Sequence, residues 1–575
     1  MLVPPVKVIR HIMGYHYRSQ YTMEGKMSVE NKGRHRWRVR LVAATLVLSL
    51  GAAACGDDGD DTSGSTGSTG TVASTGASAT GGTGATTTGA PVKGGTITIA
   101  TFSNAVGLDP AKIAGGGTVG GMEHAALYDT IVRYNNVTGA YEPRTGAFTA
   151  NADKTVWTLK LKSGIKFADG TDYNAEAVRF VVSRQMKDGN AAPKSQLLTF
   201  LDADPAKSIK VVDPLTVEFT LKLAWADFPY MFANVQGWMY SPTQFAKVND
   251  PVAFNANPGP AGAGPFRIKS YKPGEALELE KNPSYWGGEV YLDGLIFKQL
   301  ATPTAAFDAL KTGSIQAAYV RDATVQKNAK AEKFGTIDMP TIAANIININ
   351  SATIPLKARQ AMAAAIDPKV INDRAYNGNA IPDSAPFANG PNDPKVTGTK
   401  YDVNEAKKLL AEAKAAGWSG KVRLLADTSL PDWGIAVQTL LTAAGFEVEL
   451  QPKPISEIVT QVLTNKDYDI NTWAYGMSDE VPANYVQLSG AFAAPSGRYG
   501  YSSPEMVAAV DKLRTAASAA DRVAAYKAIS DIWTRDVPAI VTTSAPSALV
   551  FTPKFKGAVR TAAANILFDK AYLEK

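Results

Sequence analysis

The stretch from residue 402 to residue 475 constrains the fold most, because it alternates helix and strand signals. Asp402 and Glu405 form a capping box ahead of a run with helical apolar spacing, and Gly417 sits where that helix should end. The next predicted elements are a strand at 421–426, a helix at 435–444, a strand at 446–451, a helix at 456–464 and a strand at 469–475. This order predicts a mainly parallel α/β lobe, whose ligands bind beyond the carboxyl ends of the strands.

The rest of the chain also reads as folded α/β protein. A chain of 575 residues exceeds what one hydrophobic core usually supports, so two or more lobes are expected. Residues 96–101 and 157–161 alternate like strands, and Asn174 is a predicted N-cap for a helix beginning at Ala175.

The N-terminal region has the order of a bacterial lipoprotein signal. A basic stretch, 34–40, precedes an apolar run, 41–50, and small residues then lead into Cys55, the only cysteine in the chain. The apolar run is shorter than the ~20 residues that cross a bilayer. We therefore expect a signal region at 1–54, with Met27 as the true start, and acylation of Cys55. The alternative is a cleaved secretory signal with an incidental cysteine.

Residues 55–93 predict a lipid-anchored tether. An acidic run at 57–61 is followed by a Gly/Ser/Thr-rich run up to Gly89, which cannot bury enough apolar surface to order itself. As a flexible coil, the segment spans roughly 35 Å on average. That length suits a body held away from a membrane, and the acidic run is interpreted as solvated tether rather than as a metal site.

The charge distribution argues against nucleic-acid binding. Of the 59 basic and 53 acidic residues, nine basic and two acidic ones lie in 1–54, which leaves 50 basic and 51 acidic residues in the body. The positive net charge therefore belongs to the leader, and the body has no electrostatic signature for phosphate backbones.

Catalytic and cofactor motifs are missing from the body. Only one of the four histidines, His124, follows the leader, on a predicted helix at 122–134, and we interpret it as structural. With Cys55 acylated, no Cys–His or multi-histidine site can form in one chain. Residues 115–120 fit G-x-G-x-x-G by letter but follow no strand, so we interpret them as a loop that opens the helix. No cofactor and no metal are predicted.

Five ordered blocks carry a family resemblance over about 94–575. They are Gly94–Thr98 with Leu108–Pro110; Trp157–Thr171 with Asn174–Val178; Gly264–Phe266 with Asn282–Gly287 and Leu292–Asp293; Ala305–Leu310 with Gly313; and Asn350 with Arg359–Met362 and Ala365–Asp367. In these blocks the chain resembles the extracellular solute-binding protein family 5, the oligopeptide-, dipeptide- and nickel-binding lipoproteins of ABC importers.

The resemblance implies a fold and a set of partners. The fold is α/β, a two-lobed periplasmic-binding-protein-like fold of the large three-part form (type II). Lobe I would combine 94–133, 259–343 and 538–575, an inserted subdomain would occupy 134–258, and lobe II would occupy 344–537. The implied partners are a peptide or small-molecule ligand, an ABC permease and ATPase, and the membrane through the lipid anchor. We expect an extracytoplasmic monomer that is not an enzyme.

Ligand-binding candidates cluster after the strand at 469–475. In peptide-binding members of the family, an aspartate shortly after the tryptophan of this strand pairs with the peptide's amino terminus. Asp479, next to Glu480, is the nearest carboxylate to that place, and an aromatic pocket wall is predicted to start at Trp473. The complete set of ligand-binding candidates is Asn104, Trp473, Tyr475, Asp479, Glu480, Arg498, Tyr499 and Tyr501. Arg498 is the candidate for a ligand carboxylate, and Asn104 lies on a loop that faces ligand in the family.

Several alternatives stay open. The ligand can be an oligopeptide, a dipeptide, another amine, a sugar, an opine or a metal chelate. A sensory or adhesive module can use the same fold without transport, and neighbouring permease and ATPase genes would distinguish that case. A secreted lipoprotein hydrolase would need a nucleophile–base pair, and the sequence offers none based on histidine.

Overall fold

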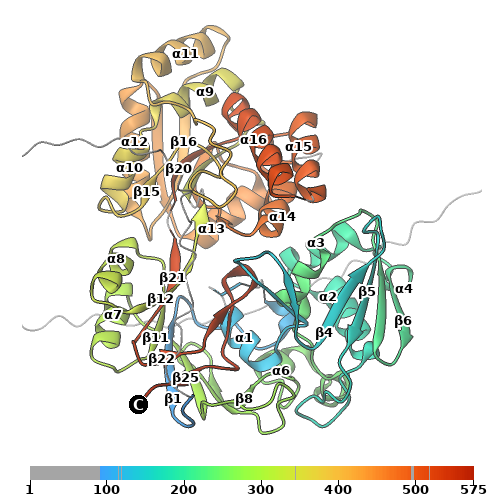
Figure 1. Ribbon diagram of the computed structural model, residues 1–575. Coiled ribbons are helices and arrows are strands. Elements are labelled where there is room, and N and C mark those ends of the chain that lie inside the picture. Colours follow the sequence, from blue (N-terminus) through green and yellow to red (C-terminus); the bar gives the residue numbers. More distant parts are fainter. Residues whose placement is uncertain are drawn as a thin grey trace, which may run out of the picture. The chain divides into compact units, whose positions relative to one another are not determined.

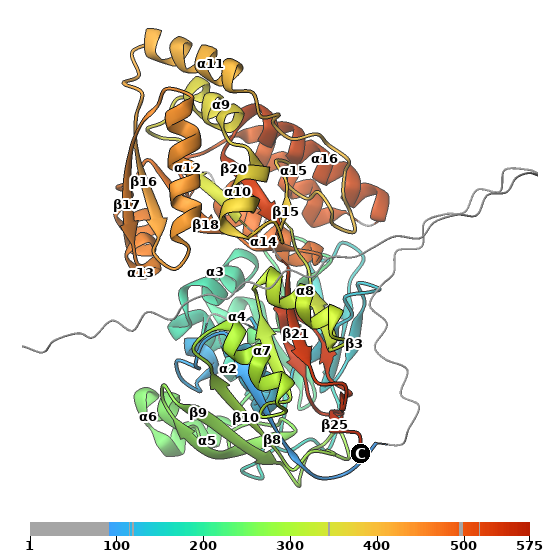
Figure 2. The same cartoon turned by 90° about the vertical axis from the view of Figure 1, so that its left-hand side faces the viewer.

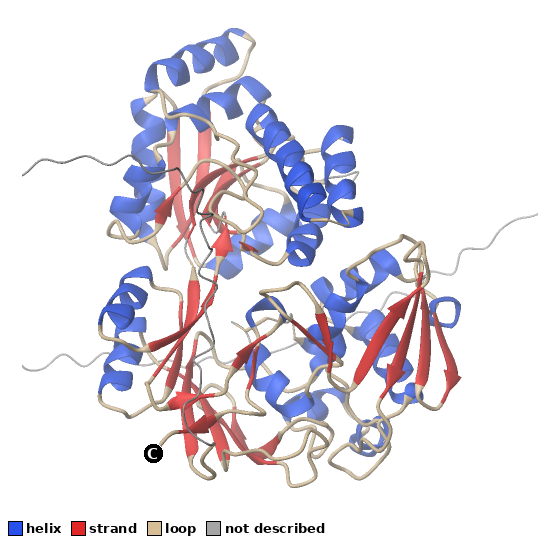
Figure 3. Cartoon of the chain, viewed as in Figure 1, coloured by secondary structure: helices blue, strands red, loops and turns tan. Residues whose placement is uncertain are grey.

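The computed structural model of the protein describes residues 91–113, 116–117, 120–342, 345–493, 498–516, 518–544 and 546–575. All of them belong to one compact unit, Ser78–Lys575, in which the strands form three larger sheets and several two-stranded ones (Figures 1 and 3). The predicted signal region, Cys55 and nearly all of the predicted tether lie outside the described residues, as do parts of the glycine-rich loop at 115–120.

The first sheet has seven strands, with β1 at its centre. β1 runs parallel to β10 and β11, and the remaining pairs are antiparallel. Ile97 and Ile99 of β1 are fully buried, as the alternation at 96–101 predicts. In sheet order the strands are β12 (Gly335–Met339), β21 (Ser547–Phe551), β11 (Ala317–Val320), β1 (Thr96–Thr101), β10 (Gly294–Gln299), β9 (Ala276–Lys281) and β8 (Phe266–Lys272).

Helices and short ribbons surround this sheet. α7 (Pro303–Lys311) and α8 (Ala323–Ala331) pack beside β11 and β21 through buried Phe307, Leu310 and Val325 (Figure 2). The other elements are α1 (Gly121–Tyr128), the ribbon of β2 (Val132–Tyr134) and β3 (Tyr141–Pro143), the ribbon of β22 (Phe555–Lys556) and β25 (Tyr572–Leu573), and the ribbon of β23 (Val559–Arg560) and β24 (Ile566–Leu567).

An inserted subdomain is built on a four-stranded antiparallel sheet. The Asn174 side chain accepts a hydrogen bond from the backbone N–H of Ala177, so the predicted cap of α2 is confirmed. In sheet order the strands are β4 (Gly146–Ala150), β5 (Val156–Leu161), β7 (Thr216–Thr220) and β6 (Ile209–Asp213). The helices are α2 (Ala175–Asp188), α3 (Ala191–Phe200), α4 (Pro205–Ser208), α5 (Pro242–Val248) and α6 (Pro251–Ala256).

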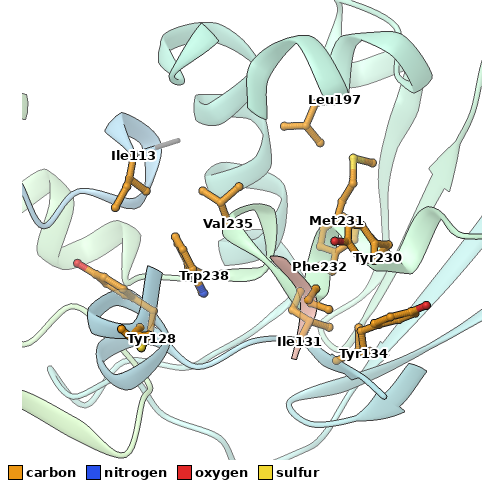
Figure 4. Close-up of a cluster of buried hydrophobic side chains, with 14 of the residues drawn as sticks. Ile113, Tyr128, Ile131, Tyr134, Leu197, Tyr230, Met231, Phe232, Val235 and Trp238 are labelled. Atoms are coloured by element: carbon orange, nitrogen blue, oxygen red, sulfur yellow. The ribbon is translucent and has the colours of Figure 1, made fainter. Parts of the chain in front are cut away.

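One apolar core joins the inserted subdomain to the seven-stranded part. Figure 4 shows Tyr128 of α1 and Ile131 near Phe232 and Trp238, with Leu197 of α3 above them in this view. All of these side chains are almost completely buried and belong to one cluster. We refer to the seven-stranded sheet, its helices and this subdomain together as lobe I.

The third sheet has six strands and forms lobe II. β16 runs parallel to β17 and β18, but β14 and β15 pair only antiparallel, so the sheet is mixed and the prediction of a mainly parallel lobe is wrong in this respect. The strand–helix repetition covers only 402–475, whereas β14 and β20 come from the two ends of the lobe. In sheet order the strands are β15 (Ile381–Pro382), β20 (Ala539–Ser544), β14 (Asn345–Ile349), β18 (Ile470–Ala474), β16 (Lys421–Asp427) and β17 (Glu447–Lys453).

The helices of lobe II agree closely with the sequence signals. Asp402 caps α11 by accepting from the backbone N–H groups of Asn404 and Glu405, and Gly417 has the positive φ that a helix end requires. The reciprocal half of the predicted capping box is wrong, because the Asp402 N–H donates to the backbone oxygen of Ala364 at 2.9 Å and not to Glu405. The helices are α9 (Leu356–Ala365), α10 (Pro368–Ala375), α11 (Val403–Ala415), α12 (Pro431–Ala443), α13 (Ile455–Val459), α14 (Val481–Ala491), α15 (Pro504–Thr515) and α16 (Ala519–Asp536). A π-helical turn, Thr460–Asn465, continues α13.

The chain passes between the lobes twice, from β12 to β14 and from β20 to β21. β20 pairs with β14 inside lobe II, whereas the expected division placed everything from 538 onward in lobe I. The chain returns to the seven-stranded sheet one strand later, at β21. Both strands are buried along nearly their whole length, so their residue patterns do not show which sheet each one joins.

The helix predicted at 122–134 is shorter than expected. α1 ends at Tyr128, because Asp129 takes a positive φ of 59° and its carboxylate accepts from the backbone N–H of Thr130. Arg144 donates to the same carboxylate at 2.6 Å, and the chain then enters β2. A buried ion pair thus overrides the helical pattern.

Candidate ligand-binding site

A hydrogen-bonded group of five residues joins the two lobes, and we call it the interlobe cluster: Asn136, Tyr230, Asp479, Glu480 and Arg560. Asp479 and Glu480 lie between β19 (Met477–Ser478) and α14 of lobe II, and the other three come from lobe I. Glu480 is 1% exposed. A buried carboxylate needs several donors to offset its lost hydration, and here the donors come from the opposite lobe.

Glu480 is saturated by these donors. Its Oε1 accepts from Asn136 Nδ2 at 2.7 Å and from Arg560 Nη2 at 2.8 Å. Its Oε2 accepts from the backbone N–H of Ala563 at 2.8 Å and from the Tyr230 hydroxyl. With four partners and almost no exposed surface, Glu480 holds the lobes together and has no free acceptor to offer a ligand.

Asp479 is paired with Arg560 in a two-pronged ion pair. Arg560 Nη1 donates to Asp479 Oδ2 at 2.9 Å, and Nη2 donates to Oδ1 at 2.6 Å. Burial opposes the charge of Arg560, but the two carboxylates outweigh it and raise the pKa of Arg560 above its ordinary value. The guanidinium therefore occupies the place at Asp479 that the sequence assigned to a ligand ammonium group.

Aromatic rings line the same junction. Tyr485 of α14 lies 5.7 Å from the ring of Trp225 and 6.2 Å from that of Phe200, both in the inserted subdomain. Phe200 and Trp225 stack on each other at 4.4 Å. All three rings are buried in the apolar core, so they hold the inserted subdomain against α14 rather than face a ligand.

A small hollow adjoins Asp479 on the side of lobe II. It is lined by Ser478, Asp479, Asn484, Tyr526 and the loop from Phe387 to Asn392. Tyr526 packs against Phe387 at 4.3 Å, and its hydroxyl accepts from Asn484 Nδ2 at 2.8 Å. Of the residues that line the hollow, only Asp479 was predicted from the sequence. Ser478, Asn484, Tyr526 and the loop from Phe387 to Asn392 were not.

Asn104 lies apart from this group. Its side chain donates to the backbone oxygen of Gly274 at 3.0 Å and to Gln299 Oε1 at 3.2 Å. It lines a different hollow, formed within lobe I next to buried Glu123 and Tyr271. In this structure Asn104 braces the end of the seven-stranded sheet.

The three predicted tyrosines are core residues of lobe II. The Tyr475 hydroxyl donates to the backbone oxygen of Gln487 at 2.7 Å, and the Tyr501 hydroxyl donates to Asp536 at 2.7 Å. Tyr499 is 1% exposed and packs on Phe492. From the sequence, an aromatic residue fits a core position and a pocket wall equally well. Only the packing shows that these three tyrosines face the core.

Trp473 and Arg498 keep some exposure. Trp473 is half-buried on β18 opposite Ile346, at a carboxyl end of a strand as predicted. Arg498 is exposed, and its backbone oxygen accepts from Lys466 Nζ at 2.7 Å. Of the eight candidates, the structure brings Asp479 and Glu480 together at the junction between the lobes.

Sequence reasoning missed Arg560, Tyr230 and Asn136. Asn136, Tyr230 and Arg560 lie 344, 250 and 80 residues from Glu480 along the chain, so no spacing rule connects them. One signal was available: two adjacent carboxylates ahead of a helix, in a body with balanced charge, call for a basic partner elsewhere.

The family model described as the middle part of bacterial extracellular solute-binding proteins, family 5, matches residues 144–494. The chain belongs to this family. The matched range contains the inserted subdomain, most of lobe II and the acidic half of the interlobe cluster, so the resemblance predicted from the five sequence blocks is confirmed.

Two curated relatives of this family 5 protein are named as binding proteins. A glutathione-binding protein of Pectobacterium atrosepticum is 27% identical over 331 residues, which cover 54% of this chain and 63% of that protein. A probable D,D-dipeptide-binding periplasmic protein of Escherichia coli is 27% identical over 381 residues, covering 64% of this chain and 71% of that protein. The match thus spans less than two thirds of the glutathione-binding relative.

A solved structure confirms the predicted fold class. The ABC transporter-associated periplasmic binding protein DppA from Helicobacter pylori, in complex with the peptide STSA, has a TM-score of 0.70 at 20% identity. The alignment covers 84% of this chain and 99% of that one. The family 5 chain therefore has the two-lobed α/β periplasmic-binding fold. The prediction of a binding protein rather than an enzyme agrees with all three names.

His124 of this family 5 protein is fully buried. Its Nδ1 lies 2.7 Å from the backbone oxygen of Gly120, and its ring stacks between Tyr128 and Trp238. Burial lowers the pKa of His124 to about 4. The described residues contain no group of three metal-ligating side chains, and none of their helices has the length and apolarity that crossing a membrane requires.

Proposed function

We propose that this family 5 protein is the extracytoplasmic receptor of an ABC importer, and that it delivers a peptide or a related amine-bearing compound. The observation that carries the proposal is the two-lobed fold whose polar contacts converge between the lobes. A ligand that touches both lobes would shift the population toward a closed form, without chemistry. Glutathione- and dipeptide-binding names among the relatives favour a peptide-like ligand.

Anchoring through Cys55 belongs to the same proposal. The signal-like order of 34–55 supports it, and a doubly acylated cysteine would hold the protein stably at the membrane where one chain would not. Cys55→Ser should move the protein from the membrane fraction to the soluble fraction. If the wild-type protein incorporates no labelled fatty acid, the anchoring proposal is wrong.

The binding proposal is tested by calorimetry with glutathione and Ser-Thr-Ser-Ala, beside Asp479→Asn and Trp473→Ala. If a ligand ammonium replaces Arg560 at Asp479, Asp479→Asn weakens binding by about 2–5 kcal/mol, whereas a solvent-exposed pair would contribute about 1 kcal/mol at most. Loss at Trp473 alone would indicate a neutral ligand such as a sugar. Turnover of a bound compound by the purified protein would overturn the proposal.

A sensory module that binds the same solute without transport is the second candidate. A sensory module would have the same contacts as a transport receptor, so uptake of the ligand by cells is the measurement that distinguishes the two functions. A strain lacking the protein should lose import of the ligand, and it should regain import with the wild-type chain.

A further inference from the structure

Two buried side chains line the hollow of lobe I that Asn104 also lines, which we call the Glu123 hollow. Glu123 of α1 is 1% exposed, and Thr101 at the end of β1 is 8% exposed. Among the described residues, Glu123 Oε2 and Thr101 Oγ1 have no hydrogen-bond partner. Unpaired buried polar atoms are costly, and in native proteins they are usually satisfied by other protein groups, an ordered water or an ion. The two oxygens therefore indicate a bound species.

Segments from across lobe I enclose the Glu123 hollow. α1 packs against β8 and supplies Glu123, β1 supplies Thr101, and the loop after β1 supplies Asn104 and Ala105. The Tyr271 hydroxyl of β8 donates to the backbone oxygen of Ala105 at 2.8 Å, which joins that strand to the loop. The hollow has room for about one water-sized particle, so an amino acid or a peptide does not fit.

Glu123 is the only acid among the described residues that line this hollow. In the described part of the chain, no basic group lies within 4.0 Å of its carboxylate. Lys272 also lines the hollow, but its ammonium group pairs with the exposed Glu275 at 3.7 Å. An ionised Glu123 is thus a buried negative charge without a counter-charge, which is costly. A proton or a small cation would neutralise it, whereas a water molecule would not.

The ligand atoms and the single charge define the class of cation. The side-chain oxygens around the hollow belong to the carboxylate of Glu123, the hydroxyl of Thr101 and the amide of Asn104, and none of the lining residues carries sulfur or imidazole. Oxygen ligands suit hard cations. A monovalent cation cancels one carboxylate charge, while a divalent cation would leave an unpaired positive charge in a buried place.

We propose that the Glu123 hollow binds one monovalent cation, sodium or potassium, through Glu123 and Thr101. The cation would connect α1 to the end of β1, and so to the loop that Asn104 braces. The carboxylate must be deprotonated to bind a cation, so binding displaces a proton from Glu123. Burial raises the pKa of Glu123 to about 7, which makes protons and cations compete near neutral pH.

Three other titratable groups lie around Glu123. Tyr271 and Lys272 at the end of β8 line the same hollow, and His124 follows Glu123 on α1. Burial and the charge of Glu123 raise the pKa of Tyr271 above its ordinary value of 10, and burial lowers the pKa of His124 to about 4. Both therefore stay neutral between about pH 5.5 and about pH 8, where the charge of Glu123 changes.

The first test compares salts at equal ionic strength. Urea unfolding of the full chain is measured at about pH 8 in sodium, potassium or choline chloride, because a ligand of the native state stabilises that state by mass action. At about 150 mM, sodium or potassium should raise the equilibrium constant for folding by about tenfold over choline. The gain should shrink at about pH 5.5, where protons occupy Glu123. Equal stability in all three salts at pH 8 would overturn the inference.

Three variants locate the effect. Glu123→Gln keeps the shape of the side chain without its charge, so its stability should be the same in the three salts. Thr101→Val removes one ligand oxygen and should weaken the cation effect. Glu275→Gln is the matched control, because Glu275 is an exposed acid on the neighbouring hairpin, and it should keep the whole effect. A Glu123→Gln protein that keeps the full gain would place the cation elsewhere and refute the site.

Crystals of the wild-type full chain grown with thallium(I) in place of potassium give a test that needs no variant to fold. Thallium(I) has the charge and nearly the size of potassium, and its anomalous scattering distinguishes it from water. An anomalous peak beside Glu123 and Thr101 supports the inference. An ordered water alone, or no density at this position, overturns it and leaves the proposed function standing.

Discussion

Removing the Arg560 side chain from the interlobe cluster should lower the free energy of unfolding far more than removing a surface arginine that forms an ion pair of similar geometry. Arg560→Met leaves a side chain of comparable length but no charge. Asp479 then loses both of its hydrogen bonds to Arg560, and Glu480 loses one of four. The side chains of Arg560, Asp479 and Glu480 are 10%, 13% and 1% exposed, so water cannot replace the missing donors.

The expected loss in the free energy of unfolding is about 3–5 kcal/mol, the usual cost of leaving a buried charge unpaired. Arg267→Met is the control, because Arg267 pairs with Glu280 at 2.7 Å while both side chains are nearly half exposed. That variant should lose about 1 kcal/mol at most. Urea unfolding at neutral pH measures both values.

A double-mutant cycle and a salt series sharpen the comparison. The double variant Arg560→Met/Asp479→Asn should lose less free energy of unfolding than the two single variants together. Removing both partners leaves no unpaired charge at position 479. Added salt should reduce the small contribution of Arg267 and leave that of Arg560 nearly unchanged. Equal losses for Arg560→Met and Arg267→Met would refute the reasoning, since burial would then make no difference.

Two other predictions concern lobe I. Asp109→Asn should lower the free energy of unfolding by about 3–5 kcal/mol, measured by urea unfolding, because it removes the charge that pairs with buried Arg184. Burial raises the pKa of Glu123 from 4.5 to about 7, so its contribution to stability is complete below pH 4.5 and is lost as the pH rises toward 7. His124, with its pKa lowered from 6.5 to about 4, contributes in the opposite sense, fully above pH 6.5 and less as the pH falls. Glu123→Gln should therefore show a free energy of unfolding that rises more steeply between pH 4.5 and 6.5 than that of the wild type, and an unchanged slope would contradict the burial of this carboxyl group.

The elements that the sequence predicted well are those whose signals are local. The capping side chains of Asp402 and Asn174 act on N–H groups two or three residues away, so their helices could be located by spacing alone. Only the predicted end of α1 is wrong, because Arg144, which lies outside the helix, fixes Asp129 and ends the helix there. Which sheet β20 joins, and whether Tyr475 faces the core or a pocket, depend on contacts with other parts of the fold. The residues next to them in the sequence do not determine either.

The candidate site divides in the same way. Asp479 and Glu480 could be singled out because carboxylates follow the carboxyl end of a strand. Their partners could not be identified, since Arg560 and Tyr230 come from lobe I and meet them only where the two lobes pack together. Charge balance indicates that a partner exists, but only the fold shows which residue it is.

The position of β21 also sets the order in which the lobes can be completed during synthesis. β21 lies between β12 and β11, and β12 pairs with no other strand of the seven-stranded sheet. That sheet therefore stays open until residues 547–551 leave the ribosome, after every strand of lobe II has been made. Although lobe I begins first, it is finished last, so a chaperone or an export factor would meet a nascent chain whose unpaired edges lie in its older half.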